Sequence, residues 1–203
     1  MASWCTDFKI VLVGDANVGK STFISRCQNQ ATTAAVNTSG VQKHTIIFQS
    51  TLGTIRFHVW DIAGRDRANA LCDGYYTATH GVILMFDVTS RASYTNTLEW
   101  HREVTGVCGD TPMVLCGNKS DIPGRCVEPN QRRFFHERDI PYYEVSAKVD
   151  HKWDAVFLSL ARQLLEDPDL KFTAAPSLAL SGALANAELM AQTREDLKRL
   201  QVN

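Results

Sequence analysis

The chain has 203 residues, of which 44% are hydrophobic and 21% charged, and its formal net charge is −1. This composition is typical of a soluble globular protein with one well-buried domain and an extension, and the near-neutral charge excludes a general attraction to nucleic acid or anionic membranes. No apolar run is long enough to cross a bilayer, and the first residues lack the basic-then-apolar pattern of a secretory leader.

Strand-like and helix-like segments alternate from residue 8 to about 167. Short apolar runs predict strands at residues 8–13, 44–49, 54–61, 82–87, 113–118 and 142–145. Helical patterns fall at residues 20–27, 92–107, 130–138 and 155–165. The alternation predicts an α/β fold, a six-stranded, mostly parallel sheet with one antiparallel edge pair and helices on both faces. Ligands of such sheets bind beyond the carboxyl ends of the strands.

The domain is assigned to residues 1–168, because Asp167-Pro168 closes the last predicted helix. Residues 169–203 form a C-terminal extension, in which a linker poor in charge precedes a helical pattern over residues 184–200. We expect this helix to dock weakly on the domain or on a partner, and a frayed tail is the alternative. The end of the chain has no cysteine for prenylation, so we expect no membrane anchor. The six cysteines form no C-x-x-C pair, which favours reduced thiols in a cytosolic or nuclear compartment.

The most informative stretch is GDANVGKS at residues 14–21, directly after the first predicted strand. Two glycines with four residues between them, followed by Lys-Ser, match the phosphate-loop pattern. In such a loop backbone N–H groups and the positive helix end face an anion, Lys20 reaches the terminal phosphates, and the Ser21 hydroxyl binds Mg²⁺. An ordinary strand–turn–helix corner is the alternative, but the strand before and the helix after favour nucleotide binding. The predicted phosphate contacts are Asp15, Ala16, Asn17, Val18, Gly19, Lys20, Ser21 and Thr22.

A second motif, Asp61-Ile62-Ala63-Gly64, follows the third predicted strand. Asp61 at a strand end can support Mg²⁺ through water, and the missing Cβ of Gly64 lets its N–H approach a γ-phosphate. This pattern is common by chance, and its position directly after a strand is what makes it informative.

Two further loops, at residues 118–121 and 146–148, predict a guanine site after the fifth and sixth strands. The Asp121 carboxylate can accept two hydrogen bonds from guanine N1 and N2, a donor pair that adenine lacks. Each loop alone could be an ordinary polar loop, but four motifs in this order at strand ends predict binding of GTP or GDP with Mg²⁺. The predicted contacts are Asn118 to the phosphate loop, Lys119 over the base, Asp121, Ser146, Ala147 to guanine O6, and Lys148.

On these motifs the chain resembles the small GTPases of the Ras superfamily over residues 8 to about 167. Among them it is most similar to the Ran branch, the GTPases of nuclear transport. The supporting stretches are FHVWD at 57–61, DGYY at 73–76, MFDVTSR at 85–91, WHR at 100–102, VLCGNK at 114–119 and DPDL at 167–170. The resemblance implies a GTP form that binds importin- and exportin-type transport receptors, with Ran-binding domains, a guanine-nucleotide exchange factor and a GTPase-activating protein as partners. It also implies a protein of the nucleus and cytoplasm that is monomeric when free.

The residue after the D-x-x-G motif departs from the family. Arg65 stands where the family normally has the glutamine that orients the attacking water. Arginine has no acceptor, so it either stabilises γ-phosphate charge in cis or points to solvent, and we predict slow intrinsic hydrolysis. Ala16 and Asn17 replace paired glycines of the Ran branch, and a Cβ at Ala16 can crowd an activating arginine. The residues assigned to hydrolysis are Lys20, Thr38, Gly64 and Arg65.

The two expected switch loops also differ from the Ran branch. Residues 30–39 contain no aromatic residue, whereas family members usually carry a Phe there that packs on the guanine edge. Thr38 aligns with the threonine that closes on Mg²⁺ in the GTP state, so the predicted metal residues are Ser21, Thr38 and Asp61. Ala68 stands where Ran has a Phe that packs into the import carrier of its GDP form, which predicts weak binding to that carrier. The acidic tail of Ran is also missing.

We interpret the chain as a GTP-binding switch of nucleocytoplasmic transport. One alternative is a GTP-loaded binding or scaffold protein that hydrolyses little, which Arg65 and Ala16 favour. Another is a trafficking GTPase of the Rab type, against which the missing C-terminal cysteine argues, since those proteins need a lipid anchor. A nucleic-acid reader is not expected, because no basic stripe with interleaved aromatics is present.

Overall fold

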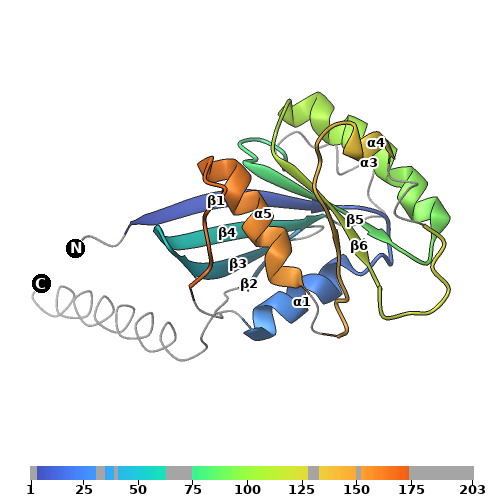
Figure 1. Ribbon diagram of the computed structural model, residues 1–203, viewed down its shortest axis with the longest axis horizontal. Coiled ribbons are helices and arrows are strands. Elements are labelled where there is room, and N and C mark those ends of the chain that lie inside the picture. Colours follow the sequence, from blue (N-terminus) through green and yellow to red (C-terminus); the bar gives the residue numbers. More distant parts are fainter. Residues whose placement is uncertain are drawn as a thin grey trace, which may run out of the picture.

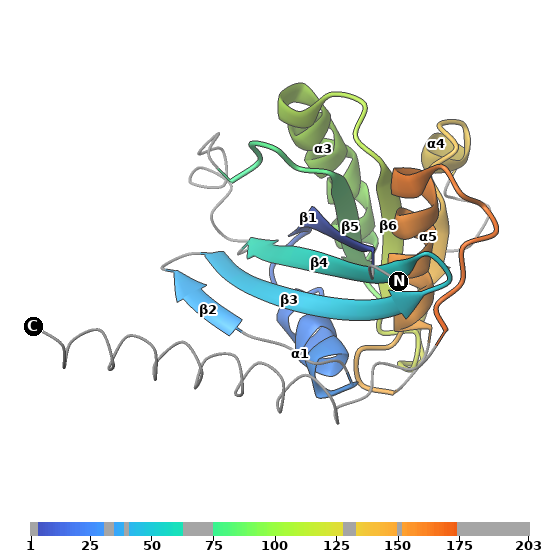
Figure 2. The same ribbon diagram turned by 90° about the vertical axis from the view of Figure 1, so that its left-hand side faces the viewer.

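The computed structural model describes residues 4–30, 35–38, 41–62, 75–127, 133–149 and 152–173. Within these residues one seven-stranded sheet runs in the order β2-β3-β4-β1-β5-β6-β7 (Figures 1 and 2). The strands are β1 (Cys5–Val13), β2 (Ala35–Thr38), β3 (Val41–Ser50), β4 (Gly53–Ile62), β5 (Gly81–Asp87), β6 (Met113–Asn118) and β7 (Tyr142–Glu144). β3 is antiparallel to β2 and β4, and the remaining neighbours are parallel.

All six predicted strands are present, and β2 joins them as a seventh at the edge of the sheet. The sequence of β2 is Ala-Val-Asn-Thr, which has no run of β-branched residues that would mark it as a strand. It is extended because its backbone pairs with Val41–His44 of β3. Pairing with a neighbour therefore sets the conformation here, where local propensity is weak.

Helices cover both faces of the sheet, as the alternation of elements predicts. The helices are α1 (Lys20–Gln30), α3 (Arg91–Cys108), α4 (Arg133–His136) and α5 (Trp153–Leu165). α1 and α5 pack on one face, and α3 and α4 on the other, each over its own apolar core (Figure 1). The prediction of a helix over residues 130–138 was too long at its C-terminal end, because α4 stops at His136 and a turn follows. Among the described helices, none combines the length and apolarity that a bilayer crossing needs.

The two central strands are buried on both faces. Every residue of β5 and β6 is buried, which explains why their sequences read as continuous apolar runs instead of alternating ones. Parallel strands bring their carboxyl ends to one edge of the sheet, so the loops after β1, β4, β5 and β6 all open at that edge. β1 lies between β4 and β5 in the sheet, and the strands that follow it in the sequence are placed on both sides of it. Sheets of this type bind ligands at such a switch point.

The chain after α5 packs on the hairpin between β3 and β4. Leu170 is fully buried, and the Phe172 ring stacks on Phe48 with 4.1 Å between ring centroids. The Thr173 N–H donates to the Gln49 carbonyl at 2.9 Å. This anchors residues 170–173 at the far end of β3. The predicted helix over residues 184–200 lies outside the described residues.

Candidate functional site

The loop between β1 and α1 has a backbone that requires glycine at two positions. Gly14 has φ 145° and a Cβ there would lie 2.1 Å from the Met85 carbonyl oxygen. Gly19 has φ 99° and a Cβ there would lie 2.3 Å from Nδ2 of Asn118. The loop is therefore pressed against the ends of β5 and β6, and its glycines are required by both conformation and space.

Asn17 also has a positive φ, of 65°. Among residues with a side chain, asparagine tolerates this left-handed conformation best, because its short amide can bond locally. An asparagine at this position is therefore compatible with the left-handed backbone of the loop. Ala16 is not among the described residues with positive φ, so its Cβ fits there without backbone strain.

Lys20 lies under this loop and is 7% exposed. Its Nζ donates to the carbonyl oxygens of Gly14 at 2.7 Å and of Asp15 at 2.8 Å. Burial lowers the pKa of Lys20 below its ordinary value, although the nearby carboxylates of Asp61 and Asp15 oppose the shift. A buried ammonium that donates to two carbonyls among the described residues is well placed to exchange them for an anion in the loop.

Ser21 and Asp61 meet at the mouth of the loop, across the end of β4. The Ser21 Oγ donates to Oδ2 of Asp61 at 2.7 Å. Burial raises the pKa of Asp61, while the hydrogen bond from Ser21 and the charge of Lys20 lower it. A buried carboxylate next to a hydroxyl is the all-oxygen donor set that Mg²⁺ prefers, and a divalent cation would favour the ionised carboxylate. These residues therefore fit a bound Mg²⁺.

Asn118, at the end of β6, joins three loops. It is 1% exposed, and its Nδ2 donates to the Val18 carbonyl at 2.9 Å. Its Oδ1 accepts from the Ala147 N–H at 3.0 Å. The tie between this loop and the phosphate loop that the sequence predicts is confirmed, and the same side chain also fixes the loop after β7.

The predicted base contacts lie together on these two loops. Oδ1 of Asp121 accepts from the Ser146 Oγ at 2.6 Å, and that hydroxyl accepts from the Val149 N–H at 2.9 Å. Ser146 therefore orients Asp121 and shapes its own loop. Lys148 is exposed beside them, and Thr22 is exposed on the first turn of α1.

Three further residues of the site escape the motif analysis, namely Asp87 on β5 and Asn96 and Trp100 on α3. The Lys119 ammonium lies 2.6 Å from Oδ2 of Asp87, at the end of β5. Burial alone would raise the pKa of Asp87, but hydrogen bonds from Lys119 and Thr89 hold it below its usual value. An acidic residue at the carboxyl end of a buried strand is the signal that could have pointed to Asp87. Asp15 likewise has unpredicted partners on α3, Trp100 and Asn96.

Three predicted residues have no described side chain. Gly64 and Arg65 lie outside the described residues. Thr38 ends β2 and pairs through its backbone with Val41, but only its backbone is described. Their predicted roles toward the γ-phosphate, Mg²⁺ and the attacking water stay predictions.

A phosphate loop on a parallel sheet, facing an aspartate and two base-binding loops, defines a P-loop nucleotide-binding protein with the small GTPase fold. A model of the Ras family matches residues 9–166, and the chain belongs to the Ras family. It is thus a small GTPase switch. Members of this family bind GTP or GDP with Mg²⁺, hydrolyse GTP, and are acted on by exchange factors and activating proteins.

Proposed function

We propose that this protein is a small GTPase of nucleocytoplasmic transport that binds importin- and exportin-type receptors in its GTP form. The six stretches shared with the Ran branch support this assignment, among them Trp100-His101-Arg102 on α3. Under this proposal the protein works in the nucleus and the cytoplasm, with Ran-binding domains, an exchange factor and an activating protein as further partners.

The site supports a nucleotide switch through the residues that would hold GTP and Mg²⁺. Lys20 exchanges the Gly14 and Asp15 carbonyls for phosphate oxygens, and Asn118 keeps the phosphate and base loops in register. Bound Mg²⁺ neutralises charge that develops on the phosphates. Ser21 would hold the ion directly, and Thr38 would join it when the first switch loop closes.

The intrinsic hydrolysis of this protein is proposed to be slow. Arg65 carries only donors, so it cannot accept a hydrogen bond from the attacking water. The test is single-turnover hydrolysis of bound GTP with Mg²⁺, comparing the natural chain with Arg65→Gln. An Arg56→Gln variant is the matched control, since Arg56 lies on β4 with a 43% exposed side chain and pairs with Asp7.

We expect the Arg65→Gln variant to hydrolyse GTP at least about tenfold faster, with the control unchanged. Equal, ordinary rates in all three proteins would show that another group places the water. A fast rate in the natural chain that falls in the variant would favour the arginine acting in cis on the γ-phosphate.

The transport assignment has its own test. Purified importin- and exportin-type receptors are titrated against the protein loaded with a non-hydrolysable GTP analogue or with GDP. The proposal expects binding at least about a hundredfold tighter to the GTP-analogue form, as a nucleotide-ordered switch loop provides. Equal affinity for both forms, or none for either, would exclude the transport assignment while leaving nucleotide binding intact.

A GTP-loaded scaffold is the second candidate, favoured by Arg65 and by the Cβ of Ala16 beside the phosphates. The two candidates differ in their response to a GTPase-activating protein. Acceleration of hydrolysis supports a cycling switch, whereas no acceleration, together with GTP found in the purified protein, supports the scaffold.

A further inference from the structure

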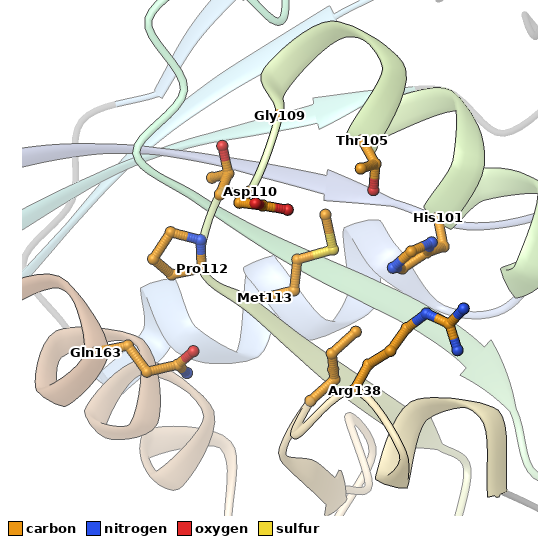
Figure 3. A pocket seen from close by; sticks show the side chains of 10 residues that line it. His101, Thr105, Gly109, Asp110, Pro112, Met113, Arg138 and Gln163 are labelled. Carbon is orange, nitrogen blue, oxygen red and sulfur yellow. The ribbon is translucent and has the colours of Figure 1, made fainter.

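A cavity of about 460 Å³ lies on the opposite side of the domain from the nucleotide loops. It is bounded by the C-terminal half of α3, the segment that enters β6, the turn after α4, and α5 (Figure 3). Met113, which opens β6, forms its centre, and Gln163 of α5 lies at one end. The nucleotide loops follow the carboxyl ends of the strands, so this cavity at the amino end of β6 has no part in that site.

Two polar atoms of α3 at this cavity are buried without a partner among the described residues. They are the Nδ1 of His101 and the Oγ1 of Thr105. The two residues are four apart on α3, so their side chains lie one above the other on the same face of the helix. Figure 3 shows both beside Met113, which lies between them and Gln163. Buried polar groups in folded proteins are nearly always hydrogen-bonded, so this pair indicates a missing partner in the cavity.

The cavity also has a fixed positive charge next to this pair. The Arg138 guanidinium stacks on the Phe134 ring at 3.8 Å, and its Nη1 donates to the Phe134 carbonyl at 3.2 Å. The His101 ring packs edge-on against Phe134 and Phe135, with centroid distances of 5.3 and 6.0 Å. Arg138 has five N–H donors in all and is held in place, so it can donate to a ligand at little cost in side-chain freedom.

The electrostatics around the ring favour an anion over a cation. Burial lowers the pKa of His101, and the charges of Arg138 and Arg102 lower it further. The acidic group that lines the cavity is Asp110, which is exposed at its rim. Arg138 is the cation that lines the cavity, and its planar guanidinium matches the two oxygens of a carboxylate, while Asp110 opposes any further negative charge at the rim.

We propose that this cavity binds a carboxylate. The ligand oxygens accept hydrogen bonds from the Thr105 hydroxyl, from His101 in its Nδ1–H form and from Arg138, while Met113 contacts its apolar part. Two sources offer this group, a small organic acid and the C-terminal carboxylate of a peptide. The site goes beyond the proposed GTPase function and does not depend on it.

The experiment is an NMR titration of the full chain loaded with GDP and Mg²⁺. The probes are sodium acetate, acetamide as its neutral isostere, and sodium chloride at matched ionic strength. A short apolar peptide with a free or an amidated C-terminus distinguishes the two sources. We expect saturable shifts at His101 and Thr105 with acetate, with a dissociation constant in the millimolar range, and none with acetamide or chloride. Tighter binding of the free-acid peptide than of acetate, lost on amidation, assigns the peptide source, and equal binding assigns small acids.

Variants distinguish acetate binding in this cavity from general effects of charge on the protein surface. Thr105→Val removes the hydroxyl at constant shape, and Arg138→Gln removes the charge. Each is expected to weaken acetate binding at least about fivefold without loss of bound GDP. Arg102→Gln is the matched control, because it removes an exposed charge of α3 that does not line the cavity, and its affinity should stay within about twofold. Shifts that do not saturate, acetamide shifts equal to those of acetate, or an equal loss in the Arg102 variant would overturn the proposal and leave a cavity filled by water.

Discussion

Asp15 connects the phosphate loop to α3, and removal of its side chain should lower the stability of the whole domain. Its Oδ1 accepts from the Trp100 Nε1 at 2.9 Å, and its Oδ2 accepts from the Asn96 Nδ2 at 2.6 Å. Its backbone carbonyl receives the ammonium of Lys20 at 2.8 Å. One residue therefore joins the core of α3 to the group that holds phosphate. The perturbation considered is Asp15→Ala.

The expected loss of stability depends on whether each hydrogen-bond donor can bond to water once the Asp15 carboxylate is removed. Trp100 is fully buried, so its N–H cannot turn to water, and an unsatisfied buried donor costs about 1–3 kcal/mol. Asn96 is half-buried and recovers part of its bond from solvent, which leaves a loss of about 1 kcal/mol. The free energy of unfolding should fall by about 2–4 kcal/mol. For a domain of this size each kcal/mol lowers Tm by about 2–4 °C, so the expected shift is about 4–16 °C.

The assay is thermal unfolding at saturating GDP and Mg²⁺, since nucleotide binding itself raises Tm. A double-mutant cycle with Trp100→Phe isolates the indole–carboxylate bond, and its coupling should be at least about 1 kcal/mol. Asp110→Ala, at an exposed position, is the matched control and should change stability by less than about 0.5 kcal/mol. Additive effects of the Asp15 and Trp100 changes, or a Tm drop no larger than that of the control, would refute the reasoning.

Four further predictions concern single residues. Asp61→Asn should weaken Mg²⁺ binding about 10- to 100-fold, measured as the Mg²⁺ dependence of GDP release, and an unchanged dependence would remove Asp61 from the metal site. Gly19→Ala should abolish nucleotide loading because its Cβ would lie 2.3 Å from a buried amide. Gly106→Ala, on the exposed side of α3 with nothing within 4 Å, should stabilise the fold by about 0.5–1 kcal/mol, and a loss of stability there would contradict the open space seen around it. The His101 ring should titrate below about 6.5 in an NMR pH series, because burial and two neighbouring arginines lower its pKa. The unfolded state then binds more protons, so this group makes the free energy of unfolding fall as pH drops through about 6.5, and a midpoint at or above that value would contradict the assignment.

Much of the fold can be predicted from local sequence, and the structure differs from that prediction at β2 and α4. β5 and β6 are predictable because strands buried on both faces need unbroken apolar runs. β2 is not, because its pairing partner β3 makes it a strand. α4 shows the opposite error, since residues 137 and 138 continue a helical pattern but form a turn. Apolar periodicity thus fixes which segments are buried, and not where each one ends.

The candidate site also contains some residues that the sequence predicts and some that it does not. Lys20, Ser21 and Asn118 are predictable because each lies in a motif whose spacing carries the chemistry. The bond from Trp100 to Asp15 joins residues 85 apart, and no periodicity links such positions. The ion pair of Lys119 and Asp87 was not predicted for the same reason, because the two residues come together only when β5 and β6 align in the sheet.

The anchoring of Phe172 on the β3–β4 hairpin fixes where the tail of this protein is tethered. From the hairpin to Asp61 the chain follows the ten residues of β4, a distance of about 30 Å. The 30 residues after Thr173 could cover that distance with about ten of them extended. A segment that starts from this anchor at Phe172 is therefore long enough to span the distance to the nucleotide loops.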